Sequence, residues 1–220
     1  MCGFAEETVN EIRSSVDTAI DLAPSHISLY TFRPTEGTVM RKAVDRKLVE
    51  LNISRQLNSY AVGRKMLIDA GYEEYGVGYF GRQAENVVGM FGMWFDVVGF
   101  GSGATSYFQH SYLGHTPGNL HNYIDNPLEY DFQDSMLSQG VALSALRSGL
   151  AMFDGIEGKN WKARVGESLS DSLKRPDFKR LLDILNVTGS LNIDKESISL
   201  KKEKAALVVV GMMNSAMMQG

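Results

Sequence analysis

The chain has few side chains of the kinds that bind metals or act as nucleophiles. Its one cysteine is Cys2, and its four histidines are dispersed. One thiol forms neither an internal disulfide nor a multi-cysteine metal site, so the sequence predicts a reduced, cytoplasmic protein. His110 and His115 share a loop-like region with Tyr107 and Tyr112. We interpret these histidines as hydrogen-bonded loop side chains, with a metal or heme site as the alternative.

A glycine cluster at residues 99–103 is the second feature that bears on chemistry. It lacks the spacing of a dinucleotide-binding loop, and the chain has no phosphate loop, nucleophile elbow or His-Glu-x-x-His motif. Glycines let a backbone approach a ligand or another strand closely. The cluster therefore predicts that the backbone here comes close either to a ligand or to another strand.

Composition sets the class of protein. The 220 residues are 44% hydrophobic and 22% charged, with a net charge of −4, as in ordinary globular proteins. The longest apolar stretch, 205–213, is too short to span a membrane. Nucleic-acid binding is not expected, because the lysines near residue 200 alternate with acidic residues in an acidic chain.

The first part of the chain alternates predicted helices and strands, which is typical of an α/β fold. Thr8 and Glu11 form a capping box that begins a helix ending near Ala23. A helical segment is also expected over 42–70, with Gly71 after its end. Strands are expected at 26–32, 74–80 and 95–100.

The pattern changes between residues 128 and 132. Helices are expected over 131–153, over 159–165, over 168–185 with an interruption at Pro176, and over 204–218. A hairpin is expected from 191–193 and 198–200. Helices with a two-stranded wing predict a winged-helix-like domain, so we divide the chain into 1–128 and 129–220. A DNA-binding regulator is the alternative reading of this half.

Several segments, in consistent order, resemble the radical SAM family of oxygen-independent coproporphyrinogen III oxidases and related heme chaperones. Met1–Thr8 looks like the family's Gly-x-Pro-x-x-Thr loop. The other segments are His26–Tyr30 with Pro34-x-x-Gly37-Thr38, Ala70–Tyr75 with Phe80-x-Arg82, Val98–Ser106, and Asn119–Tyr123. The short connections look more like the heme-chaperone branch than the oxidases.

The resemblance implies a partial, incomplete TIM-like radical SAM barrel at 1–128, followed by the winged-helix-like domain. It also implies S-adenosylmethionine and a [4Fe–4S] cluster in full-length relatives. That cluster is held by Cys-x3-Cys-x2-Cys, whereas this chain has only Cys2. We therefore expect a C-terminal portion of such a protein that is not catalytic alone.

By the same resemblance, two strand ends lie on the cofactor side of the barrel. These residues are Tyr30, Phe32 and Arg33 at one strand, and Gly103, Ala104 and Thr105 at another, near the adenosyl group. The alternative is that they are ordinary strand ends, with glycine serving barrel packing.

The family's tetrapyrrole chemistry leaves two functional hypotheses. The chain is either part of an enzyme or heme chaperone, or a stand-alone module that binds a tetrapyrrole or a protein without radical chemistry. The chaperone branch has a His-Asn-x-x-Tyr-Trp motif, and the nearest match, Glu85–Met90, lacks its histidine. An open barrel edge predicts self-association or pairing with a missing N-terminal barrel half.

Overall fold

A computed structural model describes residues 1–82, 96–108, 111–115, 120–135 and 138–204. The chain divides into two compact units, Met1–Glu85 with Leu200–Gly220, and Asn86–Ser199. The predicted division at residue 128 falls inside the second unit and stays a prediction. Within the described ranges, no helix is long and apolar enough to cross a membrane.

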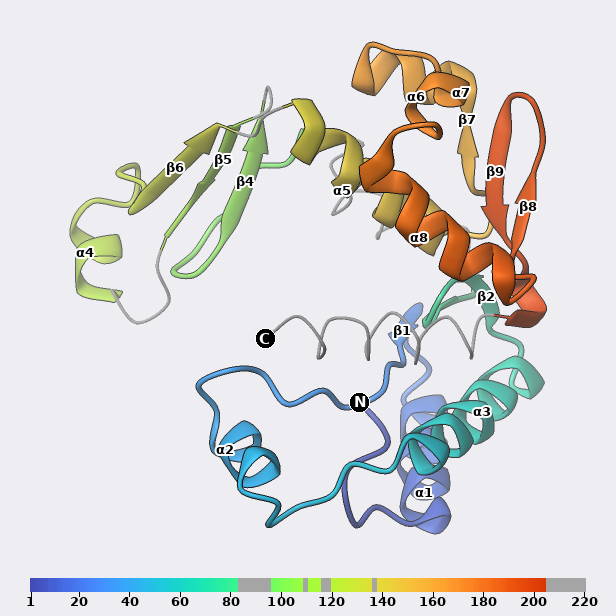
Figure 1. The fold of residues 1–220 in the computed structure, drawn as a ribbon. Helices are drawn as coiled ribbons and strands as arrows, with labels where there is room; N and C mark the ends of the chain where they lie inside the picture. The colour runs from blue at the N-terminus through green and yellow to red at the C-terminus, as the bar shows by residue number, and fades with distance from the viewer. Residues whose placement is uncertain (83–95, 109–110, 116–119, 136–137, 205–220) are drawn as a thin grey trace. The chain divides into compact units, whose positions relative to one another are not determined.

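Among the described residues of the first unit there are three α-helices (Figure 1). Helix α1, Val9–Asp21, begins with the predicted capping box, in which Thr8 and Glu11 bond each other's backbone amides. The predicted helix over 42–70 is wrong as one element, because it is two: α2, Val39–Asp45, and α3, Ile53–Asp69. Lys47, at φ 57°, cannot continue α2.

A three-stranded sheet accompanies these helices, in the order β1-β3-β2, with antiparallel pairs. Its strands are β1, His26–Ser28, β2, Glu73–Gly76, and β3, Tyr79–Gly81. The single strand predicted at 74–80 is wrong, because the chain reverses between β2 and β3. Gly78, at φ +80°, adopts the backbone conformation that this turn requires.

A short parallel contact joins the start of the chain to the end of β1. The amide of Cys2 donates to the carbonyl of Tyr30 at 2.9 Å, and the amide of Phe32 donates to the carbonyl of Cys2 at 2.6 Å. These bonds form a parallel bridge between Cys2 and Thr31. Because α1 connects the two bridged segments, the bridge and the helix together form a minimal βαβ crossover. The named strands of the described residues pair antiparallel, so a closed barrel is not confirmed.

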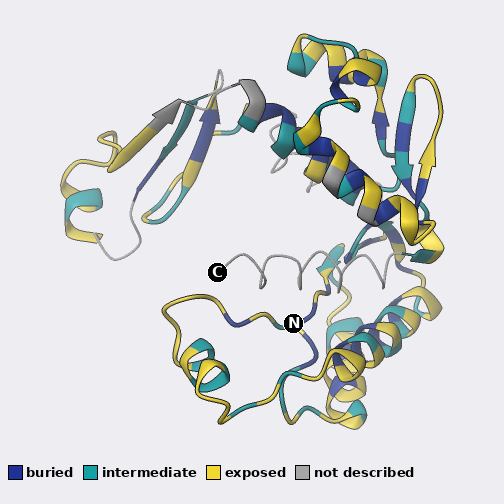
Figure 2. Cartoon of the chain, viewed as in Figure 1, coloured by how far each residue is buried: buried dark blue, intermediate teal, exposed yellow. Residues whose placement is uncertain are grey.

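The core of the first unit lies between α1, α3 and one face of the sheet (Figure 2). Ile12, Val16, Tyr60 and Leu67 of the helices pack with apolar side chains of β1, β3 and the adjoining residues. Gly63 allows this approach, because a Cβ there would lie 3.0 Å from Leu29 Cδ2. Burial of this apolar surface stabilises the unit.

The second unit contains an antiparallel sheet ordered β4-β5-β6, together with α4, Leu120–Asp125. The strands are β4, Thr105–Phe108, β5, Ser111–Gly114, and β6, Phe132–Ser135. Of the strand predicted at 95–100, residues 96–100 contribute a single bridge, between Val97 and Tyr107. The helix predicted from residue 131 is wrong at its start, because β6 occupies that segment.

The remaining elements of this unit follow the order helix, strand, helices, hairpin. They are α5, Ser138–Ala151, β7, Ile156–Glu157, α6, Gly158–Val165, α7, Leu169–Ser172, α8, Pro176–Val187, β8, Leu191–Ile193, and β9, Ser197–Leu200. Their sheet is ordered β7-β9-β8. Pro176 interrupts the helical segment as predicted, because it begins α8. A 3-10 helix at Lys202–Lys204 follows and belongs to the first unit. Beyond Lys204, the helix predicted to residue 218 lies outside the described residues.

Candidate functional site

The sheet of the first unit has one face turned away from α1 and α3. Side chains alternate along β1, so Ile27 and Leu29 join the core while His26 and Tyr30 point to the opposite face. Tyr75 of β2 and Tyr79 of β3 lie on that same face, in ring contact with His26. We call His26, Tyr30, Tyr75 and Tyr79 the aromatic face.

The rings of the aromatic face form a connected cluster. The His26 ring centroid lies 5.8 Å from that of Tyr75 and 6.2 Å from that of Tyr79. The two tyrosine rings stack at 6.2 Å. Burial raises the pKa of both Tyr75 and Tyr79, and for Tyr79 the neighbouring phenol of Tyr30 raises it further. The cluster offers flat aromatic surface.

At the end of this face, the segments around Gly3 and Phe32 are tied to helix α3 by hydrogen bonds. The Gln56 side chain of α3 donates to the carbonyl of Phe32 at 2.8 Å and to that of Gly3 at 3.4 Å. The ring of Phe32 stacks on that of Phe4 at 4.5 Å. Of the three site residues predicted at this strand end, Tyr30 lies on the aromatic face, Phe32 stacks on Phe4, and Arg33 is exposed.

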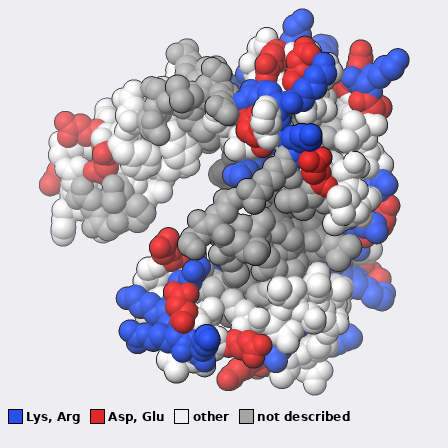
Figure 3. Space-filling view, in the orientation of Figure 1, with Lys and Arg blue, Asp and Glu red and all other residues white. Residues whose placement is uncertain are grey.

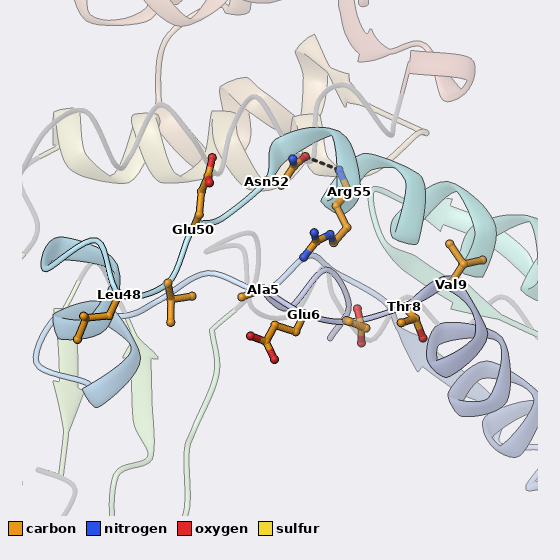
Figure 4. A pocket seen from close by; sticks show the side chains of 10 residues that line it. Ala5, Glu6, Thr8, Val9, Leu48, Glu50, Asn52 and Arg55 are labelled. Atoms are coloured by element: carbon orange, nitrogen blue, oxygen red, sulfur yellow. Dashed lines mark hydrogen bonds between the residues drawn. The ribbon is translucent and has the colours of Figure 1, made fainter.

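A pocket of about 680 Å³ lies beside these segments, between the chain entering α1 and the chain entering α3 (Figure 4). Glu6, Glu7 and Glu50 line it together with Arg55, whose side chain extends toward the Ala5–Glu6 segment. The Asn52 side chain caps α3 at the rim, accepting from the Arg55 amide at 2.9 Å. The pocket is polar and mainly acidic.

The other predicted strand end belongs to the second unit. Gly103 has φ +82°, and the carbonyl of Ala104 accepts from the amide of His115 at 3.1 Å. The Thr105 hydroxyl accepts a hydrogen bond from Tyr112 at 3.4 Å. A Cβ on Gly99 would lie 2.3 Å from the Thr105 carbonyl oxygen, so this glycine serves a close approach within the protein.

His115, which the sequence placed in a metal or heme alternative, is buried with 3% of its surface exposed. Its ring contacts Tyr123 at 4.8 Å and Tyr130 at 5.2 Å between centroids. Its Nδ1 lies 3.9 Å from Asp131 Oδ2. His110, the other histidine of that alternative, and Glu85–Met90, the nearest match to the chaperone motif, lie outside the described residues.

The residues of this chain do not fit an iron–sulfur cluster. Three thiolates are required, and the chain has only Cys2. That thiol is buried and donates a weak hydrogen bond to the carbonyl of Tyr30 at 3.6 Å. Burial, and to a lesser extent Glu7, raises the pKa of Cys2 to about 12. The thiol is a core side chain, not a ligand.

Charge on the helices and hairpin of the second unit is mixed. Figure 3 shows basic and acidic side chains interspersed over α6, α7 and the β8–β9 hairpin. Arg175 pairs with Glu167 at 3.1 Å and with Asp177 at 2.9 Å, and Lys174 pairs with Asp171. This surface has no single sign of charge of the kind that a nucleic-acid site uses.

Sequence reasoning found part of the site. It selected Tyr30 and Phe32 through the family resemblance, but it missed His26, Tyr75 and Tyr79. The alternation of polar or aromatic residues with apolar ones over 26–30 was the available signal for His26. No comparable signal existed for Tyr75 and Tyr79, because the hairpin that joins them was read as one strand.

The chain is similar to proteins of tetrapyrrole metabolism. It is 29% identical over 148 residues to a heme chaperone, HemW, of Synechocystis sp., which covers 66% of this chain and 34% of that protein. Its fold matches Escherichia coli coproporphyrinogen III oxidase (HemN), a radical SAM enzyme, with a TM-score of 0.67 and 14% identity, over 96% of this chain and 52% of the other. No protein-family model matches the chain.

Both similar proteins agree with the family that the sequence motifs resemble. The resemblance to the radical SAM family of oxygen-independent coproporphyrinogen III oxidases and heme chaperones is confirmed, with partial coverage. The chain spans about a third of the length of the heme chaperone and about half that of the oxidase chain.

Proposed function

We propose that the chain binds a tetrapyrrole on its aromatic face, in heme biosynthesis or heme delivery. The observation that carries the proposal is the grouping of Tyr30, Tyr75, Tyr79 and His26 on the sheet face opposite the helices. Aromatic side chains pack well against flat aromatic ligands. The similar proteins, a heme chaperone and a coproporphyrinogen oxidase, are named for tetrapyrroles.

The proposal includes the architecture of the two units, a partial barrel and a winged-helix-like domain. The parallel bridge between Cys2 and Thr31, with α1 packed outside it, supports a partial barrel in the first unit. In a barrel, the face opposite the helices is the interior, and the aromatic face is that face. The element order of the second unit, with its β7-β9-β8 sheet, supports a winged-helix-like domain.

The same proposal gives the chain no radical chemistry of its own. In the full-length relatives the cluster and S-adenosylmethionine generate the radical, whereas Cys2 cannot hold a cluster. We propose that the chain corresponds to the C-terminal portion of such a protein, with Gly103, Ala104 and Thr105 facing the adenosyl group. Pairing with a further barrel portion, or self-association, would cover its open strand edges.

A second candidate is a stand-alone binding module that uses a tetrapyrrole without radical chemistry. The buried thiol of Cys2 is compatible with it, because a cluster ligand has to be accessible as a thiolate, but the barrel portion without its own cluster shares this feature. Size-exclusion chromatography separates the two: the module is a stable monomer, whereas the barrel portion associates. Reconstitution with iron and sulfide is expected to give no cluster absorbance in either case.

Fluorescence titration with metal-free protoporphyrin IX tests tetrapyrrole binding. We expect saturable one-to-one binding, weakened about three- to tenfold by Tyr79→Ala and by Tyr30→Ala, since each removes one aromatic contact. Phe100→Ala is the matched control, because Phe100 is an 88% exposed aromatic residue of the second unit. Equal losses in all three variants, or no saturable binding by the native chain, would contradict the proposal.

A further inference from the structure

His26 has an enclosed nitrogen that the fold does not use. Its Nε2 is shielded from solvent and has no hydrogen-bond partner among the described residues, and the same is true of the Tyr75 hydroxyl beside it. Buried polar atoms are normally hydrogen-bonded, so an exception asks for an explanation. Two such atoms within one ring cluster mark this end of the aromatic face as a place where a ligand is expected.

The chemistry around His26 selects the class of ligand. Within the described ranges, no group of three or more histidine, cysteine, aspartate or glutamate side chains is arranged to hold a metal ion. A bare ion would therefore lack ligands here. A metal held in a tetrapyrrole brings four nitrogen ligands of its own and needs a single axial ligand from the protein, commonly an imidazole nitrogen.

We propose that Nε2 of His26 is the axial ligand of the iron of a heme seated on the aromatic face, a step that rests on the proposed tetrapyrrole binding. The rings of Tyr75 and Tyr79 lie 5.8 and 6.2 Å from the imidazole and would offer aromatic surface to the macrocycle. Ligation would satisfy the unpartnered nitrogen, and a polar group of the ligand would satisfy the unpartnered hydroxyl of Tyr75.

His26 fits this role better than the other described histidines. It is only partly buried, at the beginning of β1, whereas His115 is enclosed between Tyr123 and Tyr130 with 3% exposure. His121 is exposed on α4, outside any aromatic cluster of the described residues. His115 Nδ1 also has no hydrogen-bond partner among the described residues, but of these two histidines only His26 is partly exposed.

Parallel titrations with ferric heme and with metal-free protoporphyrin IX test the assignment. His26→Ala is expected to bind ferric heme at least about tenfold more weakly, the loss typical of a disturbed metal site. It should also lose the absorbance and electron paramagnetic resonance signature of imidazole-ligated iron. Metal-free porphyrin, which needs no axial ligand, should bind at most about threefold more weakly, from the loss of the small imidazole ring contact alone. His121→Ala is the control and should retain both the affinity and the signature.

Added imidazole provides the second measurement. If His26 supplies the ligand, free imidazole restores the spectral signature in His26→Ala, which a merely structural role would not allow. An unchanged heme spectrum in His26→Ala, while both probes still bind, overturns the assignment and leaves the proposed function intact. Failure of the native chain to bind metal-free porphyrin overturns the proposed function, and the assignment with it.

Discussion

The carboxylate of Glu74 on β2 accepts a hydrogen bond from the phenol of Tyr60 on α3 at 3.0 Å. Both side chains are fully buried, and Arg64, one turn along α3, donates to the same carboxylate at 2.6 Å. Burial and the neighbouring carboxylate raise the pKa of Tyr60, so the phenol remains a donor. This triad ties the hairpin of the aromatic face to the helix behind it.

Removing the arginine of this triad should destabilise the first unit. Arg64→Met leaves the Glu74 carboxylate buried without its cation, and we expect a loss of about 2 kcal/mol, below the usual range for fully buried pairs because Arg64 is partly exposed. Urea unfolding measures the change. Lys65→Met is the matched control: its pair with Asp69 is exposed, so the loss should stay below about 0.5 kcal/mol. Equal losses would show that Glu74 needs no cation.

The thiol of Cys2 should be unreactive in the folded protein. It is 1% exposed, and its pKa is raised to about 12, chiefly by burial, so little thiolate is present near neutral pH. We expect reaction with a disulfide reagent to be fast in urea and slow in buffer, at a rate set by unfolding. Rapid modification of the native chain would contradict the placement of Cys2 in the core.

The same thiol gives the stability a pH dependence on the alkaline side. In the unfolded chain a thiol ionises near pH 8.5 to 9, whereas in the folded chain it ionises near pH 12. Between these values the unfolded state binds fewer protons, so the free energy of unfolding falls as pH rises, by up to about 1.4 kcal/mol per unit. Cys2→Ala should lower this slope between pH 9 and 10, measured by urea unfolding. A slope unchanged by Cys2→Ala would refute the raised pKa.

Gly3 should tolerate no side chain. Its φ is +78°, and a Cβ there would lie 2.7 Å from Gln56 Cγ and 2.9 Å from Gln56 Cα. We expect Gly3→Ala to cost about 2 kcal/mol or more, from backbone strain and the clash together. Gly37→Ala is the control, because Gly37 has φ +82° with nothing within 4 Å, and should cost about 1 kcal/mol from strain alone. Thermal unfolding of both variants measures the difference, and equal shifts would mean that Gln56 moves aside.

Local signals in the sequence predicted the elements whose ends are marked by specific residues. The capping box of Thr8 and Glu11 predicted the start of α1, and Pro176 predicted the break before α8. The β8–β9 hairpin was also predicted, and Asp194 explains why: its carboxylate accepts from the amides of Glu196 and Ser197 in the turn. These features depend on neighbouring residues only, so one sequence is enough to find them.

Elsewhere, the pairing of strands could not be predicted from the sequence. The β4–β5 hairpin is local, with Tyr107 paired to Tyr112, and it went unpredicted because Gln109 and His110 between its strands are not the residues typical of hairpin turns. Strand β6 was predicted as helix because its pairing, Tyr112 with Asp134, joins residues far apart in the chain. The aromatic face was missed for the same reason. His26 and Tyr79 meet because Ser28 pairs with Tyr79 across β1 and β3, which no periodicity within either segment specifies.

In the second unit, a hydrogen bond joins two buried side chains. The indole nitrogen of Trp161 donates to the Ser172 hydroxyl at 2.8 Å, and that hydroxyl donates to Glu167 at 2.6 Å. Trp161 also meets Phe178 edge to face, with ring centroids 6.0 Å apart. The bond therefore links α6 and α7 beside the aromatic contact to α8.

The stability losses from removing the two partners of this bond should not be additive. Trp161→Phe keeps an aromatic ring but loses the donor and some volume, and we expect a loss of about 2 kcal/mol. Ser172→Ala leaves the indole without this acceptor and should cost about 1 kcal/mol. In the double variant the losses should fall short of additivity by about 1 kcal/mol, because one bond is shared. Urea unfolding of the four proteins closes the cycle, and strict additivity would show that the bond contributes nothing to stability.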